Sequence, residues 1–239
     1  MNEIHKIYSY LGGSHAYGLN NENSDRDERG VFLNTKKSEI FGLETHEHQE
    51  NKVTDTFYFE LRNFLKLARK GNTQVLEALF NTNHILTTDQ FNIIKASRRS
   101  LLDSETIFKT LRGYSQGEKN IIIGANTGKL GEKRKSAIEK YGYSYRNVVH
   151  CLRLLRCGII FFQTDNYPVN IVEGDKELGP LIKDIKNNPG NHKLPDLLEE
   201  ITRQDELLKK SFDDRATNYE FDVNIAAEIC NYCYKPFLV

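Results

Sequence analysis

The spacing of apolar residues changes near residue 60, and this change constrains the fold more than any other feature. Before it, short runs rich in β-branched and aromatic residues predict strands at 4–11, 30–33, 39–43 and 52–59. After it, apolar residues recur at helical spacing and predict helices from residue 61 to Gly71 and at 73–80, 88–102, 104–116, 143–163, 195–211 and 222–233. We therefore expect an α+β chain with a small mixed sheet. A change of period near residues 85–105 marks the expected boundary between domain 1–87, which contains this sheet, and a mostly helical domain 88–239.

The net charge of the chain gives no support for nucleic-acid binding through overall electrostatic attraction. The 239 residues include 33 basic and 33 acidic side chains, so the formal net charge is zero and nucleic-acid binding must be argued from local clusters. No apolar run approaches the ~20 residues that span a bilayer. The first ten residues, MNEIHKIYSY, lack the apolar core of a signal peptide, and we expect a cytoplasmic location. Nothing in the sequence indicates an oligomeric state.

The cysteines and two of the histidines suggest metal sites only weakly. We expect Cys151, Cys157, Cys230 and Cys233 to be reduced, as is usual in a cytosolic chain. Cys230 and Cys233 have the spacing of half a zinc site, but no second pair follows. The segment ETHEHQEN at 44–51, with His46 and His48, reads as an exposed acidic loop.

The polar segment GGSHAYGLNNENSDRDERG, at 12–30, contains the strongest chemical signal. On a strand, Asp25 and Asp27 would point to the same face. Neighbouring carboxylates repel unless a cation or a proton lies between them, and their oxygens suit Mg²⁺. Two such ions can stabilise the attacking and leaving oxygens of a phosphoryl displacement. Gly13 and Ser14 could bind phosphate groups through backbone N–H groups and a hydroxyl.

This spacing resembles the signature of the DNA polymerase β superfamily of nucleotidyltransferases, a Gly-Ser pair followed about ten residues later by Asp-x-Asp. The form GSHAYG…SDRDERGVF is similar to a branch associated with RNA ligases and RNA repair in bacteria and phages. The similarity continues through the Val75-Leu76-Glu77 and Lys140-Tyr141-Gly142-Tyr143 segments and the His150-x-x-Arg153 pair, and covers most of residues 8–165. The residues at 26 and 28, arginine and glutamate, depart from the hydrophobic residues of the familiar pattern.

The resemblance implies roles for individual residues in a polymerase β-like core. Gly13 and Ser14 would bind the nucleotide phosphates, and Asp25 and Asp27 would coordinate two Mg²⁺ or Mn²⁺ ions. A third carboxylate would complete the metal site and help to deprotonate the attacking hydroxyl. We expect Asp55 in this role, with Glu60 as the alternative.

The helical half offers residues for binding the nucleotide or an RNA end. Basic and aromatic residues alternate in 129–146, after the glycine-rich segment 124–131, which we expect to be a loop. A solvated charged face beside buried tyrosines would give the same pattern, and His150 on an apolar helix could equally be a hydrogen-bonded core residue. With the resemblance, the expected nucleotide-binding residues are Lys133, Arg134, Lys135, Lys140, Tyr143, His150 and Arg153.

The sequence therefore predicts a metal-dependent enzyme that transfers a nucleoside monophosphate from an NTP to an acceptor hydroxyl and releases pyrophosphate. The resemblance suggests an RNA end, such as that of a tRNA, as the acceptor. Two alternatives stay open at this point. One is transfer to a protein side chain or a small molecule, and the other is a degenerate module that only binds nucleotide or RNA.

Overall fold

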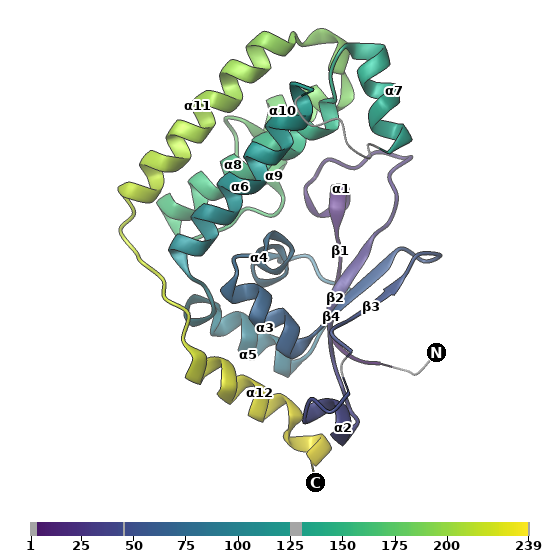
Figure 1. Cartoon of the computed structure of the whole chain (residues 1–239), viewed down its shortest axis with the longest axis vertical. Helices are drawn as coiled ribbons and strands as arrows, with labels where there is room; N and C mark the ends of the chain where they lie inside the picture. Colours follow the sequence, from purple (N-terminus) through teal and green to yellow (C-terminus); the bar gives the residue numbers. More distant parts are fainter. Residues whose placement is uncertain (1–3, 45, 125–130, 239) are drawn as a thin grey trace. The chain divides into compact units, whose positions relative to one another are not determined.

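The computed structural model describes residues 4–44, 46–124 and 131–238 (Figure 1). The chain divides into two compact units, one formed by Met1–Ile107 with Asn218–Val239 and the other by Phe108–Thr217. Residues 88–107 and the C-terminal segment thus pack with the sheet. These units are defined by packing alone, and the domain boundary after residue 87 remains a prediction.

The first unit is built on a mixed sheet. Its described strands are β1 (His5–Leu11), β2 (Glu28–Leu33), β3 (His48–Asn51), β4 (Thr56–Glu60) and β5 (Leu86–Thr87), in the order β3-β4-β2-β1-β5. β2 and β4 are parallel, whereas the other neighbouring strands are antiparallel. This sheet, followed by a mostly helical chain, confirms the predicted α+β class.

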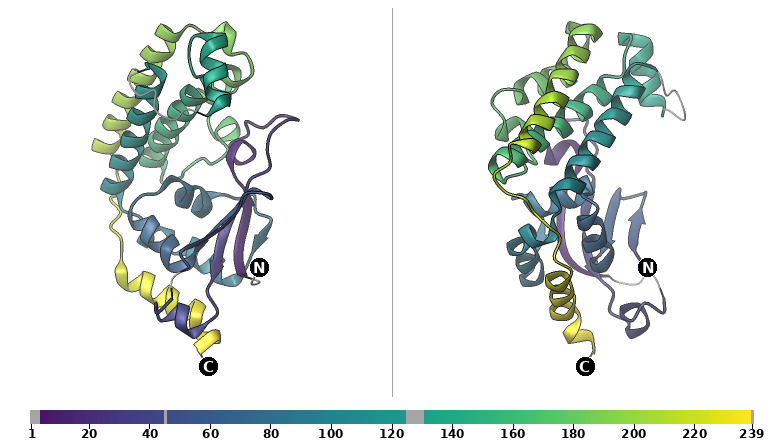
Figure 2. Two further views of the ribbon diagram at one scale, coloured as in Figure 1. Left: turned by 45° about the vertical axis from the view of Figure 1, so that its right-hand side comes forward. Right: turned by 60° about the vertical axis from the view of Figure 1, so that its left-hand side comes forward.

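Helices of the first unit pack on one face of the sheet (Figure 2). α3 (Leu61–Arg69) contacts β2 and β4, and α5 (Asp89–Ala96) contacts β1. The α3 residues Leu61, Phe64, Leu65 and Ala68 are buried, which is the face that the helical spacing predicted. The remaining helical segments of this unit are α1 (Gly13–Ala16), α2 (Lys37–Ile40), α4 (Thr73–Phe80), α5 (Asp89–Ala96), the 3₁₀ turn η1 (Arg98–Leu101) and α12 (Val223–Leu238).

The region between β2 and β4 differs from the prediction in three places. Residues 37–40 form α2 instead of a strand, and the Arg62 guanidinium donates hydrogen bonds to its C-terminal carbonyls. Residues 48–51 form β3 instead of a loop, because their backbone pairs with β4. Residues 52–55 form a turn instead of the start of a strand, and the Asn51 side chain accepts hydrogen bonds from the backbone N–H groups of Val53 and Thr54.

The second unit is a helical assembly around α8 (Tyr145–Thr164), whose side chains are buried along most of its length. α8 packs against α10 (Gly179–Asn187) and α11 (Leu194–Asp213). A Cβ atom at Gly158 would lie 2.6 Å from Leu111 Cδ1 and 2.8 Å from Leu208 Cδ1, so glycine allows α8 to approach its neighbours closely. The other helical segments are α6 (Ser104–Ile122), which begins in the first unit, α7 (Glu132–Tyr141), α9 (Ile171–Gly174) and the 3₁₀ turn η2 (Pro189–Asn191).

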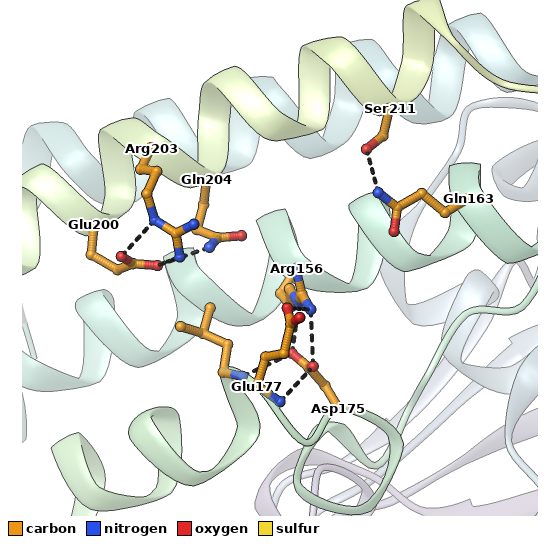
Figure 3. A network of polar contacts seen from close by, with 9 residues as sticks. Arg156, Gln163, Asp175, Glu177, Glu200, Arg203, Gln204 and Ser211 are labelled. Carbon is orange, nitrogen blue, oxygen red and sulfur yellow. Dashed lines mark hydrogen bonds and ion pairs between the residues drawn. The ribbon is translucent and has the colours of Figure 1, made fainter.

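A buried ion pair connects α8 with the segment between α9 and α10 (Figure 3). Arg156 donates hydrogen bonds to both carboxylate oxygens of Asp175, at 2.6 and 3.0 Å, and also pairs with Glu177. Asp175 further accepts hydrogen bonds from the backbone N–H groups of Glu177 and Leu178. These bonds outweigh the effect of burial and lower the pKa of the Asp175 carboxyl.

No helix in the described ranges combines the length and the apolar character needed to cross a bilayer.

All four cysteines, which lie within the described ranges, are free thiols. Burial raises the pKa of Cys230 to about 11 and that of Cys233 to about 12, so both thiols of α12 are protonated at neutral pH.

Candidate active site

Two aspartates lie side by side where the parallel strands of the sheet begin. Asp27 directly precedes β2, and Asp55 directly precedes β4. Glu28 and Thr56 are paired residues of these strands, and the Glu28 N–H donates a hydrogen bond to the Asp55 carbonyl at 3.0 Å. Parallel pairing therefore places at one edge of the sheet two carboxylates that are far apart in the sequence.

Burial and the neighbouring charges shift the pKa of Asp27. Burial raises the pKa of Asp27 to about 6, and a side-chain hydrogen bond with Asp55 and the charges of Asp55 and Asp25 add to the effect. Arg29 acts in the opposite direction, and its Nη2 lies 3.9 Å from Asp27 Oδ1 and 3.6 Å from Asp55 Oδ1. Asp25 is exposed in the preceding loop and contributes through its charge. The site thus contains more negative charge than its arginine neutralises.

The Gly12-Gly13-Ser14 segment adjoins the same pair. β1 is antiparallel to β2, so its C-terminal end lies beside the start of β2, and the Gly12 N–H donates a hydrogen bond to the Asp27 carbonyl at 2.8 Å. Gly13 has a φ of +56°, and a Cβ atom at this position would overlap Asp27 Oδ2. Only glycine meets both conditions without strain. The predicted phosphate loop and the predicted metal ligand are therefore in direct contact.

The position of the loop is fixed by a buried carboxylate on α4. The Tyr17 hydroxyl donates a hydrogen bond of 2.9 Å to Glu77 Oε1, and Glu77 is only 3% exposed. The buried Leu19 donates a backbone hydrogen bond to the Ser14 carbonyl at 2.9 Å. Tyr17 and Leu19 both follow α1 in the chain, and their hydrogen bonds hold Ser14 beside the sheet.

Asp55 has an unusual backbone conformation. Its φ is +46°, and the only other described non-glycine residue with positive φ is Asp165. This left-handed conformation is sparsely populated for residues with a side chain, although aspartate tolerates it better than most. It occurs in the last residue of the turn, next to Asp27. Such strain is frequently found at functional positions.

Glu60, the alternative third carboxylate, lies at the opposite end of β4 and has other partners. It is the N-cap of α3 and accepts hydrogen bonds from the backbone N–H groups of Arg62 and Asn63. The Arg62 guanidinium and the Tyr234 hydroxyl, which belongs to α12, also donate to this buried carboxylate. Of the two residues, only Asp55 lies beside Asp27.

The donor set fits a hard divalent cation. In the described part of the chain, no group of three or more His, Cys, Asp or Glu side chains is arranged to hold a metal ion as it stands. Asp27 and Asp55 nevertheless offer adjacent carboxylate oxygens, the ligands that Mg²⁺ and Mn²⁺ prefer, and Asp25 supplies a further negative charge nearby. A cation between the two carboxylates would compensate the repulsion that, together with burial, raises the pKa of Asp27.

The residues expected to bind the nucleotide from the helical half belong to the second unit. α7 contains Lys133, Arg134, Lys135 and Lys140, and α8 contains His150 and Arg153. Lys135 pairs with Glu132 at 3.3 Å, and the Lys140 Nζ lies 5.1 Å from the centre of the Tyr141 ring. The glycine-rich loop predicted before α7 falls mainly on residues 125–130, outside the described residues.

Tyr143 is a core residue. Its side chain is buried, and its hydroxyl donates a hydrogen bond of 2.7 Å to the Pro189 carbonyl. Burial raises the pKa of this phenol. Its ring is therefore not available for stacking on a base in this conformation, and its role in nucleotide binding remains a prediction.

His150 and Arg153 form a polar cluster with two residues that the sequence did not indicate. Glu118 of α6 accepts a hydrogen bond from the buried Asn147 amide, and its Oε1 lies 3.8 Å from His150 Nε2. Arg153 is 1% exposed, and its Nη2 lies 3.4 Å from His150 Nδ1. Burial, Arg153 and Arg134 lower the pKa of His150 to about 3, so its imidazole is neutral at physiological pH. Glu118 and Asn147 lack a sequence signal because their neighbours come from separate helices.

Comparisons with known proteins identify the family of the chain. The family model described as "RNA repair pathway DNA polymerase beta family" matches residues 2–218. A comparison with curated proteins gave no match. Among solved structures, a nucleotidyltransferase-like protein from Exiguobacterium sibiricum aligns with 98% of this chain and 75% of its own, at 11% identity and a TM-score of 0.36. With the family model spanning nearly the whole chain, this protein belongs to the RNA repair pathway DNA polymerase β family and is a nucleotidyltransferase of the polymerase β superfamily.

Proposed function

We propose that the protein transfers a nucleoside monophosphate from an NTP to a hydroxyl group at an RNA end, with release of pyrophosphate, in a metal-dependent reaction. The observation that carries this proposal is the contact between Asp27 and Asp55 beside Gly13. A pair of carboxylates next to a glycine-containing loop suits the transfer of a phosphoryl-type group better than hydrolytic chemistry that needs a Ser-His or Cys-His pair.

Asp25, Asp27 and Asp55 would hold the divalent cations that enzymes of this superfamily typically use. When bound, these cations neutralise the triphosphate and stabilise the charge that develops on the attacking and leaving oxygens. The residues around them supply the other requirements of the reaction.

Gly13 and Ser14 bind the phosphate groups through backbone N–H groups and the Ser14 hydroxyl in this proposal. Asp55 accepts the proton of the acceptor hydroxyl through its carboxylate, because it is the more exposed member of the pair and reaches solvent. The acceptor oxygen then forms a bond to the α-phosphorus while the bond from that phosphorus to the pyrophosphate oxygen breaks. The proton passes from Asp55 to solvent, and the site returns to its initial charge.

The second unit offers a surface that suits RNA. Arg134, Lys140 and Arg146 are exposed on α7 and at the start of α8. The Arg146 guanidinium lies 5.5 Å from the centre of the Tyr145 ring, and the Tyr141 and Tyr145 rings pack edge to face. Cations beside aromatic rings favour contacts with phosphates and unstacked bases. Together with the RNA repair pathway in the description of the family, this surface supports RNA as the acceptor.

A labelling experiment tests the proposal and separates it from its alternatives. The purified protein is incubated with Mg²⁺ or Mn²⁺, each α-labelled NTP in turn, and a mixture of total RNA and cell protein. We expect label in RNA. Label in protein or in a small molecule would instead support modification of those acceptors, and an NTP that binds without any transfer would support a module that only binds nucleotide.

A variant of the basic surface tests the RNA contact separately. Replacement of Lys140 and Arg146 by glutamine should weaken RNA binding and reduce its dependence on salt concentration, since each lost phosphate contact reduces counterion release. The affinity for NTP alone serves as the control. Unchanged RNA affinity in this variant would contradict the proposed surface.

A further inference from the structure

Arg29 has a fixed stem and a loosely held head group. It lies on β2 opposite Tyr10 of β1. A Cβ atom at Gly12 would lie 2.6 Å from Arg29 Cγ, so the absence of a side chain at Gly12 leaves the space that the arginine stem occupies. The stem therefore packs against the residue that precedes the proposed phosphate loop.

The guanidinium of Arg29 is held by charge and not by direct hydrogen bonds to the aspartates. Its Nη2 lies 3.9 Å from Asp27 Oδ1 and 3.6 Å from Asp55 Oδ1. Both distances exceed those of N–H···O hydrogen bonds, which are about 2.7–3.2 Å. The Arg29 side chain is 26% exposed, so water also reaches it. Ion pairs of this kind separate easily when another cation competes for the carboxylates.

We propose that Arg29 exchanges partners during the reaction cycle. In the metal-free protein its guanidinium partly neutralises Asp27 and Asp55. Once these carboxylates hold a divalent cation, the guanidinium is repelled and turns to the nearest anion, the triphosphate bound at Gly13 and Ser14. Arg29 is then a catalytic residue that contacts substrate phosphate, and this inference rests on the proposed function.

The geometry favours this exchange for two reasons. The stem is anchored beside Gly12, so a rotation of the outer side-chain bonds can move the head group between the carboxylates and the loop without a change in the backbone. A guanidinium is also the side-chain group that best matches two phosphate oxygens at once. An arginine with a purely structural role has no reason to affect the two ligands in opposite directions.

Binding measurements on three variants test the proposal. Mn²⁺ binding is followed by electron paramagnetic resonance. Binding of an ATP analogue with a methylene group between the α- and β-phosphorus atoms is followed by calorimetry at saturating Mn²⁺. We expect Arg29→Gln to bind Mn²⁺ about fivefold more tightly and the analogue about tenfold more weakly than the wild type. Arg26→Gln, which removes an equal charge from an exposed residue next to Asp27, should change both affinities by less than about twofold.

Arg29→Lys keeps the positive charge and should leave the Mn²⁺ affinity within about twofold of the wild type. Thermal melting of every variant establishes that it is folded. Mn²⁺ binding by Arg29→Gln that is equal to or weaker than that of Arg26→Gln would overturn the role of Arg29 while leaving the metal site intact. A wild-type protein that binds no Mn²⁺, or binds it equally well after Asp27→Asn, would overturn the proposed function and this inference together.

Discussion

The Asp27 carboxyl group, when protonated, donates a hydrogen bond to Asp55, although each residue lies just outside the sheet, directly before a strand. The contact exists because β2 and β4 are parallel and begin at the same level of the sheet. A shift of one residue between these strands would separate the two carboxylates. The chemistry of the site therefore depends on the backbone register of the first unit, and substitutions near that edge should affect activity more than stability.

Alanine at Gly13 should abolish nucleotide transfer, because its Cβ atom would overlap the Asp27 carboxylate. Gly142 provides a matched control, since its φ of +78° is also positive but nothing lies within 4 Å of an added Cβ atom. Both variants should lose about 1 kcal/mol of unfolding free energy from backbone strain. Urea unfolding and a transfer assay would separate the effects. Transfer activity in Gly13→Ala equal to that of Gly142→Ala would contradict the assignment of this loop.

Phenylalanine at Tyr17 should loosen the proposed phosphate loop. The substitution leaves the buried Glu77 without the hydrogen bond that it accepts from the tyrosine hydroxyl. We expect KM for the NTP to rise about fivefold, because a neutral-to-charged hydrogen bond contributes about 1.5–3 kcal/mol and part of this fixes the loop. The value of kcat should change less. Tyr232→Phe, at a tyrosine that is 48% exposed on α12, is the control. An unchanged KM in Tyr17→Phe would show that the loop does not depend on this contact.

Asparagine at Asp175 should destabilise the second unit by about 3 kcal/mol, because it removes one partner of a buried ion pair and leaves Arg156 without its main counter-charge. Glu177→Gln should cost less than about 0.5 kcal/mol, because the Glu177 side chain is 80% exposed. Chemical unfolding of both variants measures the difference. Equal stability of the two variants would contradict this account.

The lowered pKa of Asp175 also makes the stability of the protein depend on pH. The contribution of Asp175 to the unfolding free energy is present above its unfolded pKa and is lost as the pH falls through its folded pKa.

Lys95 should make the stability of the protein increase between pH 8 and pH 10. Burial, together with the charge of Arg98, lowers its pKa from 10.5 to about 8. In this interval the unfolded chain binds a proton that the folded chain does not, so the unfolding free energy rises with pH. The Nζ of Lys95 donates a hydrogen bond of 2.6 Å to the Asn81 carbonyl and lies 4.7 Å from the centre of the Tyr8 ring.

Urea unfolding of the wild type and of Lys95→Met across this pH range measures the effect. Other groups titrate equally in both proteins, so the difference between them isolates the lysine. A difference in stability that stays constant from pH 7 to pH 10 would contradict a lowered pKa.

The sequence predicted those parts of the fold that local pattern determines. The apolar stripe of α3 and the strand before Gly12 were recognised from their spacing. β3 was missed because its residues, HQEN, are polar, and only pairing with β4 makes them a strand. Asp55 was expected within a strand, whereas it ends a turn that the Asn51 side chain stabilises.

The candidate site shows the same limit. Asp25 and Asp27 were identified from their alternation, and Asp55 from its place in the resemblance. The contacts of Arg29 with Asp55 and of Glu118 with His150 could not be predicted, because these partners come from distant parts of the chain. Ion pairs and hydrogen bonds of this kind form only in the packed structure, and the spacing of residues in the sequence does not predict them.

The rate of pyrophosphate release with RNA and NTP present, in the wild type and in Asp27→Asn, tests the central claim most directly. Glu22→Gln is the matched control, since it removes a negative charge from an exposed residue of the same polar segment. We predict that Asp27→Asn lowers the rate at least about 100-fold, because a carboxylate next to the reacting groups cannot be replaced by a neutral amide. Glu22→Gln should retain the wild-type rate within about twofold. Wild-type release in Asp27→Asn would contradict the claim that these aspartates form the catalytic centre.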